Sequence, residues 1–315
     1  MTNFLDRVKD ERSLKALIGL DHPAFNKLLE EFTPCFKQRL RRYRRKAKKR
    51  HQRKPGGGRK SILGSIENQL FFILFYLKSY PTFDVLAFTF GISLSCAAAS
   101  VHRLLPILER AQKNLRVLPK RPSDDPGEIM QLIKNNEHII VDATERPHFR
   151  PKDKEAQKKF YSGKKHQHTV KNTIISDTRK RILVVGETVP GSQHDYSLFK
   201  EEFDPKNDLF RSTVVSVDLG YQGIKKDYAS PENIRIPHKK PRKSKNNPDP
   251  KLTPEQRQEN QQMSRTRVVV EHAIGGIKIF RVLTARLRNE INDFSDKVIL
   301  LACGLWNLKN SFTVQ

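Results

Sequence analysis

The chain has few cysteines, few acidic residues and no long apolar run. Its three cysteines, Cys35, Cys96 and Cys303, are far apart and show no paired spacing, which excludes a disulfide framework and a cysteine-based zinc site. The longest apolar runs, 70–77 and 298–303, are far shorter than the roughly 20 residues that a membrane span requires. The N-terminal segment MTNFLDRVKDER also lacks the apolar core of a signal sequence. We therefore expect a protein of the reducing cytoplasm without a membrane partner.

Acidic residues are strongly outnumbered by basic ones. The sequence has 34 Asp and Glu against 60 Lys and Arg, which gives a formal net charge of +26. Such an excess predicts a polyanionic partner, because neutralising phosphates releases their counterions and supplies sequence-independent affinity. With 315 residues and 37% hydrophobic content, the chain can still bury a real core in one large or two modest domains.

Basic residues concentrate between Lys37 and Lys60, where 14 Lys and Arg stand without one acid. The stretch closes with three glycines followed by Arg59 and Lys60, which is typical of a flexible basic arm. A solvated helix face is the alternative, but these charges repel one another unless phosphates are near, and this favours DNA contact. Residues 1–36 carry apolar side chains at intervals of three or four and predict short amphipathic helices, so 1–60 forms a helical segment and arm.

Residues 61–115 predict a compact all-α helix-turn-helix domain. Ser61 can cap a first helix, Gly91 ends a second, and Ser93 caps a third, after which Pro106 can restart a fourth. In a helix-turn-helix the later helix enters the major groove of DNA. Helix packing without DNA produces the same pattern, so base reading by this helix stays open. Its possible base-reading residues are Ser95, Ser100, His102 and Arg103.

Residues 116–137 contain three prolines and a glycine and predict a linker, and 138–315 predict a second, α/β domain. Three strands come first, and helices then alternate with strands, which predicts a mixed sheet flanked by helices. The expected strands are 138–143, 168–176, 181–189, 213–218 and 233–236, and the expected helices are 192–203, 221–229 and 253–281.

Two aspartates end apolar strands of this domain. Asp142 closes HIIVD and Asp218 closes VVSVD, and both would emerge at one sheet edge if the two strands are parallel neighbours. Strand alternation puts Asp142 on the opposite face from Glu145, which favours Asp142 as a ligand for a hard divalent cation. A helix or turn cap is the alternative for Asp142. Tyr221 follows Asp218 closely, and we expect its ring to pack in the core instead of stacking on a base or contacting a phosphate.

A third carboxylate, Glu271, lies within a long helical pattern. Helical periodicity puts Arg267, Glu271 and Lys278 on one face. A surface ion pair between the first two is the alternative. However, the pair Gly275-Gly276 costs a helix about 1 kcal/mol per glycine relative to alanine, which indicates close approach by backbone or ligand and favours a functional face.

Two loops offer further candidates. The segment 161–168 combines Lys164 and Lys165 with glycine and an aromatic residue, which suits phosphate contact, although a solvated hairpin fits equally well. His194 and Asp195 fall in the first turn of an expected helix. Asp195 there either favours the positive end of the helix dipole or adds a fourth carboxylate to the site.

Five motifs in this order resemble DDE transposases of bacterial insertion sequences, a domain group shared with Harbinger-type nucleases. They are VDATERP, YSGKKHQHTVKN, PGSQHD, DLGYQG and RVVVEHAIGGIK, and the resemblance covers about residues 60–310. The last is similar to the family signature Tyr-x2-Arg-x3-Glu-x6-Lys, met by Arg267, Glu271 and Lys278, whereas Ser264 stands in the tyrosine place. This departure puts any role of the tyrosine in doubt.

The resemblance implies a ribonuclease H-like fold in which Asp142, Asp218 and Glu271 hold two Mg²⁺ or Mn²⁺ ions. It also implies that Lys278 and Arg267 hold phosphate, and that the helix-turn-helix domain binds terminal inverted repeats. Water would cut a phosphodiester at the element's end, and the freed 3′-OH would then attack target DNA. We expect a homodimer on double-stranded DNA in the nucleoid. A domesticated nuclease or a non-catalytic DNA-binding regulator is the alternative, but the presence of all three acids favours the enzyme.

Overall fold

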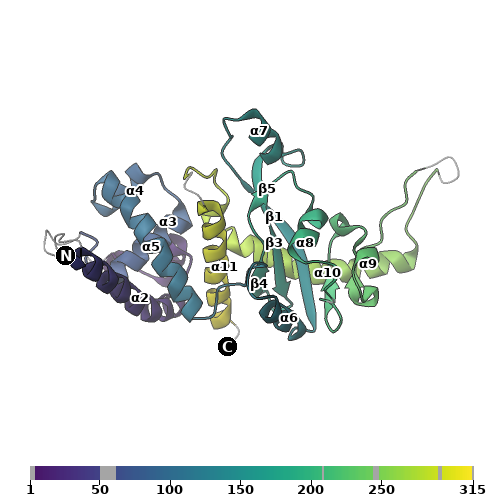
Figure 1. The fold of residues 1–315 in the computed structure, drawn as a ribbon, viewed down its shortest axis with the longest axis horizontal. Coiled ribbons are helices and arrows are strands. Elements are labelled where there is room, and N and C mark those ends of the chain that lie inside the picture. The colour runs from purple at the N-terminus through teal and green to yellow at the C-terminus, as the bar shows by residue number, and fades with distance from the viewer. Residues whose placement is uncertain (1–3, 50–61, 208, 244–247, 290–292, 314–315) are drawn as a thin grey trace. The chain divides into compact units, whose positions relative to one another are not determined.

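The computed structural model describes residues 4–49, 62–207, 209–243, 248–289 and 293–313 (Figure 1). The chain forms two compact units, each with its own core. The first unit comprises Met1–Leu118, Ile277–Ala285 and Asn292–Gln315, and the second comprises Pro119–Gly276 and Arg286–Ile291. This division differs from the boundaries expected from the sequence, because the C-terminal helix packs with the N-terminal helices instead of with the sheet.

The first unit is all-α. Helix α2 packs on α5, α1 packs on α3, and α11 packs on α2 and α5. Its elements are η1 (Leu5–Arg7), α1 (Glu11–Ile18), α2 (His22–Lys49), α3 (Ile66–Ser79), α4 (Phe83–Phe90), α5 (Leu94–Asn114), η4 (Arg281–Leu283) and α11 (Phe294–Thr313).

Side-chain caps define the helices of the expected helix-turn-helix. Ser65, Thr82 and Ser93 cap α3, α4 and α5, each accepting a hydrogen bond from the backbone N–H three residues further on. Gly91 ends α4 in the left-handed conformation, with a φ of 63°. The cap of α3 is therefore Ser65, and the expected cap Ser61 lies outside the described residues.

Helix α5 continues through Pro106, where the sequence predicted a restart. An internal proline costs a helix about 3 kcal/mol, but the apolar side chains on both sides of it, Leu104, Leu105, Ile107 and Leu108, are buried and keep the helix on the core. Among the described residues, no single helix is long and apolar enough to cross a membrane. Only α4 and α5 together, bent by 97°, meet that criterion of length and composition.

Helix α2 also corrects an expectation, because it carries the basic stretch as helix as far as Lys49. Its first half is anchored in the core by Phe25, Leu28 and Phe32. Arginine, lysine, glutamine and alanine are good helix formers, and propagation from an anchored helix costs far less than nucleation. The first part of the expected flexible arm is therefore helical, and 50–60, with Arg59 and Lys60, lie outside the described residues.

The second unit is built on a mixed sheet, as predicted. Strand order is β2-β3-β1-β6-β7, and β4 and β5 also pair with β3. Strand β1 is antiparallel to β3 and parallel to β6, which is parallel to β7. The expected strand 181–189 is split in two. The strands are β1 (His138–Pro147), β2 (Tyr161–Ser162), β3 (Gln167–Asp177), β4 (Ile182–Val185), β5 (Val189–Pro190), β6 (Val214–Ser216) and β7 (Ile234–Arg235).

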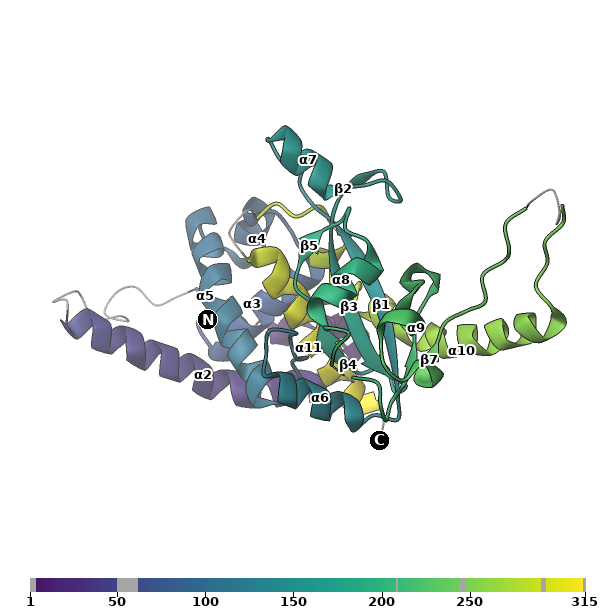
Figure 2. The ribbon, with the colours of Figure 1, turned by 45° about the vertical axis from the view of Figure 1, so that its right-hand side comes forward.

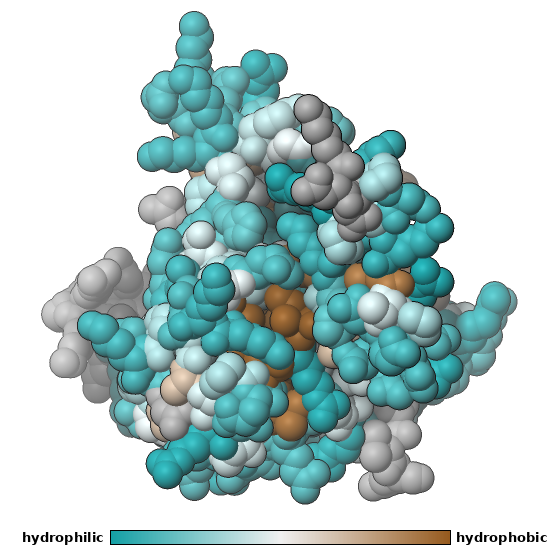
Figure 3. Space-filling view, turned by 90° about the vertical axis from the view of Figure 1, so that its right-hand side faces the viewer, coloured by the Kyte–Doolittle hydropathy of each residue, from teal (hydrophilic) through white to brown (hydrophobic). Residues whose placement is uncertain are grey.

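Helices cover both faces of this sheet. Helix α8 lies in front of the sheet in Figure 1 and α10 runs behind it, an arrangement that Figure 2 also shows. The side where α9 and α10 lie is mainly hydrophilic, with apolar areas between hydrophilic groups (Figure 3). The helices are α6 (Pro126–Lys134), α7 (Lys154–Phe160), α8 (Asp195–Glu202), η2 (Leu219–Tyr221), α9 (Ile224–Asp227), η3 (Pro231–Asn233) and α10 (Pro254–Ile277).

The apolar core of this unit shows which side chains of β1 face helix α8. Ile139 and Val141 belong to one buried cluster with Tyr196 and Phe199 of α8. Because side chains alternate along a strand, Asp142 points to the opposite face, toward the side of α10. The mixed α/β sheet flanked by helices confirms the expected fold class, a ribonuclease H-like domain preceded by an all-α region.

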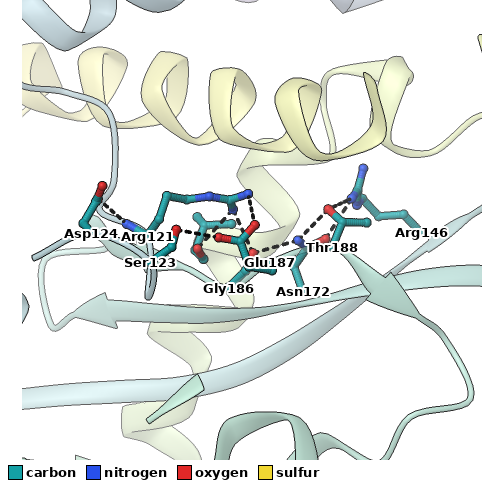
Figure 4. Close-up of polar contacts among 9 residues, drawn as sticks. Arg121, Ser123, Asp124, Arg146, Asn172, Gly186, Glu187 and Thr188 are labelled. Carbon is teal, nitrogen blue, oxygen red and sulfur yellow. Dashed lines mark hydrogen bonds and ion pairs between the residues drawn. The ribbon is translucent and has the colours of Figure 1, made fainter. Parts of the chain in front are cut away.

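A buried polar network ties the expected linker to the sheet (Figure 4). Arg146 is 1% exposed and donates to Asn172 Oδ1 at 2.8 Å, and Asn172 Nδ2 donates to the carbonyl of Gly186 at 2.9 Å. Arg121 donates to the same carbonyl at 2.8 Å. The segment 116–137 also contains α6, so it is structured instead of being an irregular linker.

Candidate active site

The strands that lead to Asp142 and Asp218 are parallel neighbours, which is the condition under which the sequence placed both aspartates at one sheet edge. Strand β1 pairs with β6 in a register that joins His138 to Val214 and Ile140 to Ser216, where the pairing ends. Asp142 lies in β1, and Asp218 follows two residues after the end of β6, at the start of η2. The negative charge of Asp218 acts on Asp142, so the two carboxylates lie near each other beyond the end of β6.

The expected strand end at Asp142 is wrong. Strand β1 continues to Pro147, because the residues after Asp142 pair with the long antiparallel β3, from Ala143 opposite Thr173 to Pro147 opposite Thr169. Asp142 thus lies within a strand and is partly buried. What ends near Asp142 is the parallel partner β6, whose last residue is Ser216.

Both carboxylates accept a hydrogen bond from nearby backbone. Asp142 Oδ1 accepts from the N–H of Ala143 at 2.8 Å, and Asp218 Oδ1 accepts from the N–H of Gly220 at 2.7 Å, which caps η2. A Cβ atom at Gly220 would lie 2.9 Å from Asp218 Oδ1, so glycine fits this turn. Both bonds involve Oδ1, so Oδ2 of each aspartate takes no part in them.

The electrostatic environment of Asp142 is that of a carboxylate cluster. Burial raises its pKa to about 6, and the negative charges of Asp218 and Asp195 add to this rise. The N–H of Ala143 and the positive charge of Arg267 act in the opposite direction. Carboxylates that repel one another in a partly buried site are stabilised by a bound cation.

Asp195 is a neighbour of this pair. It lies in the first turn of α8, as expected, but the helix starts at Asp195 instead of at 192, and His194 caps it by accepting the N–H of Tyr196 on Nδ1 at 3.3 Å. A Cβ atom at Gly220 would lie 3.6 Å from Asp195 Oδ2 as well as against Asp218. The helix N-terminus therefore brings Asp195 beside Asp218, whereas its role in the chemistry stays a prediction.

A buried lysine occupies the other side of Asp195. Lys171 is 6% exposed, and its Nζ lies 2.6 Å from Asp195 Oδ1 and 3.6 Å from Glu145 Oε1. The same ammonium donates to the carbonyl of Gln193 at 2.7 Å. Glu145 and Lys171 are direct partners across β1 and β3. Lys171 thus joins both strands to the start of α8.

Glu271 lies on α10 beside Arg267, as helical periodicity predicted. Arg267 Nη2 is 3.6 Å from Glu271 Oε1, and the side chains are 22% and 55% exposed. The positive charge of Arg267 also acts on Asp142. Arg267 therefore connects the exposed Glu271 with the carboxylates of the sheet.

The glycine pair of α10 does not interrupt the helix. Helix α10 continues through Gly275 and Gly276 to Ile277, and no described atom lies within 4 Å of a Cβ built at Gly275. Close approach by backbone is therefore wrong at Gly275, whose surroundings are open. The helix ends four residues before the expected 281, and Lys278 lies in the turn that follows it.

Three other candidates occupy contrasting positions. Lys164 and Lys165 are exposed in the turn between β2 and β3. The segment therefore forms the solvated hairpin, while its contact with phosphate stays a prediction. Tyr221 has no exposed surface, and its ring packs against Tyr196 and Phe199, which confirms core packing. Burial raises the pKa of Tyr221 well above its ordinary value.

The base-reading candidates on α5 are only partly available. Ser95 is exposed, but Ser100 is 3% exposed, so its expected role as a reading residue is wrong: it faces the core. The His102 ring lies 6.4 Å from that of Phe83. Arg103 Nη2 donates to Gln69 Oε1 at 3.1 Å.

The donor chemistry of the site fits a divalent metal. Within the described parts of the chain, no three Asp, Glu, His or Cys side chains form a ready-made metal-binding group. Asp142 and Asp218 nevertheless supply hard oxygen donors from β1 and from the turn after β6, and they repel each other. Two such carboxylates are what Mg²⁺ or Mn²⁺ prefers.

Comparison with known proteins decides the family. Residues 141–307 match the DDE superfamily endonuclease family, and residues 62–113 match the helix-turn-helix of DDE superfamily endonucleases. The chain belongs to the DDE superfamily of endonucleases. It is 30% identical over 299 residues to a probable transposase for insertion sequence element IS702 of Microchaete diplosiphon, covering 94% of each chain. No solved structure matches it.

This DDE endonuclease contains two site features that the sequence did not single out. One is Lys171, and the available signal was a lysine in the interior of the expected strand 168–176. The other is Gly191, where a Cβ would lie 1.8 Å from Thr169 Oγ1 and 2.9 Å from its carbonyl oxygen. Gly191 therefore lets β5 lie against β3 directly before the turn that leads to Asp195.

Proposed function

We propose that this DDE endonuclease is a DNA transposase that binds the terminal inverted repeats of its element and performs metal-dependent strand cleavage and strand transfer. One observation carries the proposal: Asp142 lies in β1, Asp218 closely follows the parallel neighbour β6, and the charge of Asp218 raises the pKa of Asp142. The family match and the likeness to the IS702 transposase support the same reaction class.

Asp142, Asp218 and Glu271 would hold the divalent metal, as two Mg²⁺ or Mn²⁺ ions. When bound, the metal supplies Lewis-acid activation of the attacking oxygen and stabilises the leaving oxygen of the phosphodiester. Glu271 would contribute from α10, where Arg267 lies between it and the sheet carboxylates.

Cationic side chains of the site would hold the substrate phosphate. Arg267 is close enough to Asp142 and Glu271 to bind a phosphate oxygen next to the reacting bond. Lys278 follows the end of α10 and would bind a neighbouring phosphate. Lys171 forms an ion pair with Asp195 and would hold this carboxylate in place beside Asp218.

The helix-turn-helix would recognise duplex DNA through the start of α5. Ser95 is exposed in the first turn of that helix, with His102 further along. Both transposon ends and the target would be double-stranded DNA, and two chains would bring the two ends together. This places the protein on the nucleoid.

The test is cleavage of duplex DNA that contains the sequence flanking this reading frame, with Mg²⁺ or Mn²⁺. We expect Asp142→Asn, Asp218→Asn and Glu271→Gln each to lower cleavage by at least a hundredfold while leaving DNA binding within about threefold of wild type. Glu155→Gln is the control, because Glu155 is 73% exposed on α7. Full cleavage by any of the three site variants would refute the assignment.

The wild-type chain itself separates the enzyme from a regulator. Specific binding of the flanking repeats without cleavage in either metal would identify a non-catalytic DNA-binding protein of the same fold. Cleavage of RNA or branched DNA in preference to the repeats would identify a different nuclease.

A further inference from the structure

A groove runs between the basic half of α2 and the second half of α5, within the first unit. Its volume is about 750 Å³, and it is lined by Arg39, Arg42 and Arg45 from α2 and by Arg110 from α5. A second hollow of about 400 Å³ shares Arg39 with it and adds Arg103. We call the two together the α2–α5 groove.

The cations of this groove have no ion-pair partner in the part of the chain that the structure describes. Among the described residues, Arg39, Arg42, Arg45 and Arg110 form no ion pair with a carboxylate. Burial lowers the pKa of Arg103, and the charge of Arg39 adds to this lowering. Like charges held together in this way are stabilised by an anion that lies between them.

The arginines of α2 are arranged along a line. Arg39, Arg42 and Arg45 recur every three residues and are all exposed, so they follow one side of the helix at a rise of about 4.5 Å each. Arg103 is held in position by Gln69, to which it donates at 3.1 Å, and by the ring of Phe36, 6.0 Å from its guanidinium carbon. A line of cations with one pre-oriented guanidinium suits an extended polyanion better than a single small anion.

The groove also has an apolar floor and an aromatic wall. Phe36, Leu40 and Ile107 line the second hollow. Tyr43 lines both hollows and is 59% exposed. Apolar surface of this kind packs against deoxyribose, while the guanidinium groups bind phosphate oxygens.

We propose that the α2–α5 groove binds one sugar-phosphate strand of a DNA duplex, independently of base sequence. The proposal rests on the proposed function, because it makes the groove a second DNA contact of the same enzyme. Backbone contacts of this type position a protein on the duplex, whereas base contacts elsewhere supply the specificity. Arg103, expected from the sequence to read bases, becomes a phosphate contact.

The helix offers a matched control for the experiment. Arg41 and Arg44 are exposed on the same stretch of α2 but do not line either hollow. The double variants Arg39→Gln/Arg42→Gln and Arg41→Gln/Arg44→Gln therefore remove the same charge from the same helix. Both are compared in the full-length chain, with circular dichroism to show that each keeps its helix content.

The measurement is binding to a fluorescent 30-base-pair duplex of mixed sequence over a series of salt concentrations. We expect the groove variant to lose at least tenfold in affinity and its plot of log K against log salt to become shallower by about 2, since each phosphate contact contributes about 0.9. The control variant is expected to stay within about threefold of wild type.

Equal losses of affinity in the two double variants would overturn the proposed role of the groove, because they would show that DNA binding depends on net charge alone. That result would leave metal-dependent cleavage untouched, so the proposed function would stand. If the wild-type chain binds no duplex at all, both the groove and the proposed function fail.

Discussion

Lys171 places its ammonium 2.6 Å from Asp195, inside a site that otherwise gathers negative charge. The pair lies where β3 meets the start of α8, and Asp195 in turn lies beside Asp218 across Gly220. A buried cation at this point offsets the repulsion among the carboxylates and fixes the N-terminus of α8 to the sheet. Lys171 is therefore a positioning residue for the site.

Replacing Lys171 by methionine would leave Asp195 without its cation. Removing one partner of a buried ion pair costs on the order of 3 kcal/mol, because the remaining charge is poorly solvated. We expect Lys171→Met to lower the free energy of unfolding by about that amount, as measured by urea denaturation. The double variant Lys171→Met/Asp195→Asn should recover at least half of the loss, since neither charge remains.

Lys200→Met is the matched control for this prediction. Lys200 pairs with Asp227 at 3.1 Å, but both side chains are about 40% exposed, and a solvated pair of this kind contributes about 1 kcal/mol or less. Equal destabilisation by the two lysine variants would contradict a special role for Lys171. Lys171→Met also leaves the carboxylates with more uncompensated negative charge, so the Mg²⁺ concentration needed for half-maximal cleavage should fall, an effect that a lysine acting only through fold stability would not produce.

The buried carboxyl group of Glu202 should make the folded protein less stable as the pH rises. Burial raises its pKa to about 7 from the ordinary value near 4.5, and its carboxylate oxygens are shielded beside Gly186. The folded state therefore holds this proton more tightly than the unfolded chain does. The stabilisation is fully present below about pH 4.5 and is lost as the pH rises through about 7, by on the order of 3 kcal/mol.

The measurement is the free energy of unfolding between pH 5 and 8. Glu202→Gln should remove most of this slope and raise stability at pH 8, because the neutral amide replaces a carboxyl that must otherwise ionise in a buried place. Glu232→Gln, at an exposed position, should leave the slope unchanged. A slope of the opposite sign that disappears in Glu202→Gln would show that the ionised form is the one stabilised.

Replacement of Gly191 and Gly275 by alanine should have opposite effects on stability. At Gly191 a Cβ would lie 1.8 Å from Thr169 Oγ1, so Gly191→Ala should cost about 1–3 kcal/mol through overpacking. At Gly275 the position is open and helical, so Gly275→Ala should add up to about 1 kcal/mol. Thermal unfolding of both variants tests this, and a destabilised Gly275→Ala would show a close neighbour at that position.

The sheet could be predicted because strand patterns report burial directly. The run HIIVD lies in the central strand β1, the first three residues of VVSVD form its parallel neighbour β6, and Asp218 follows closely after β6. The strand end at Asp142 was wrong for a physical reason. The length of β1 is set by its antiparallel partner β3, and that pairing involves residues about 30 positions away.

Other features depend on tertiary neighbours that no local pattern contains. The basic stretch after Lys37 was predicted to be flexible because a block of like charges ends in a glycine cluster, but the core contacts of Phe25 and Phe32 start a helix that propagates into it. Ser100 has the character of a surface residue and is buried by packing. Lys171 is buried because its partners, Asp195 and Glu145, come from other segments of the chain.

Removal of the Tyr221 hydroxyl should affect the stability of the protein without affecting cleavage. Its hydroxyl is buried and has no hydrogen-bond partner among the described residues, while the charges of Asp142, Asp195 and Asp218 act on it. A buried hydroxyl without a partner costs about 1 kcal/mol or more, so Tyr221→Phe should raise the free energy of unfolding by about 1 kcal/mol. Cleavage should stay within about threefold of wild type if the ring alone is needed. A loss of cleavage in a more stable Tyr221→Phe protein would instead show that the hydroxyl takes part in arranging the three carboxylates.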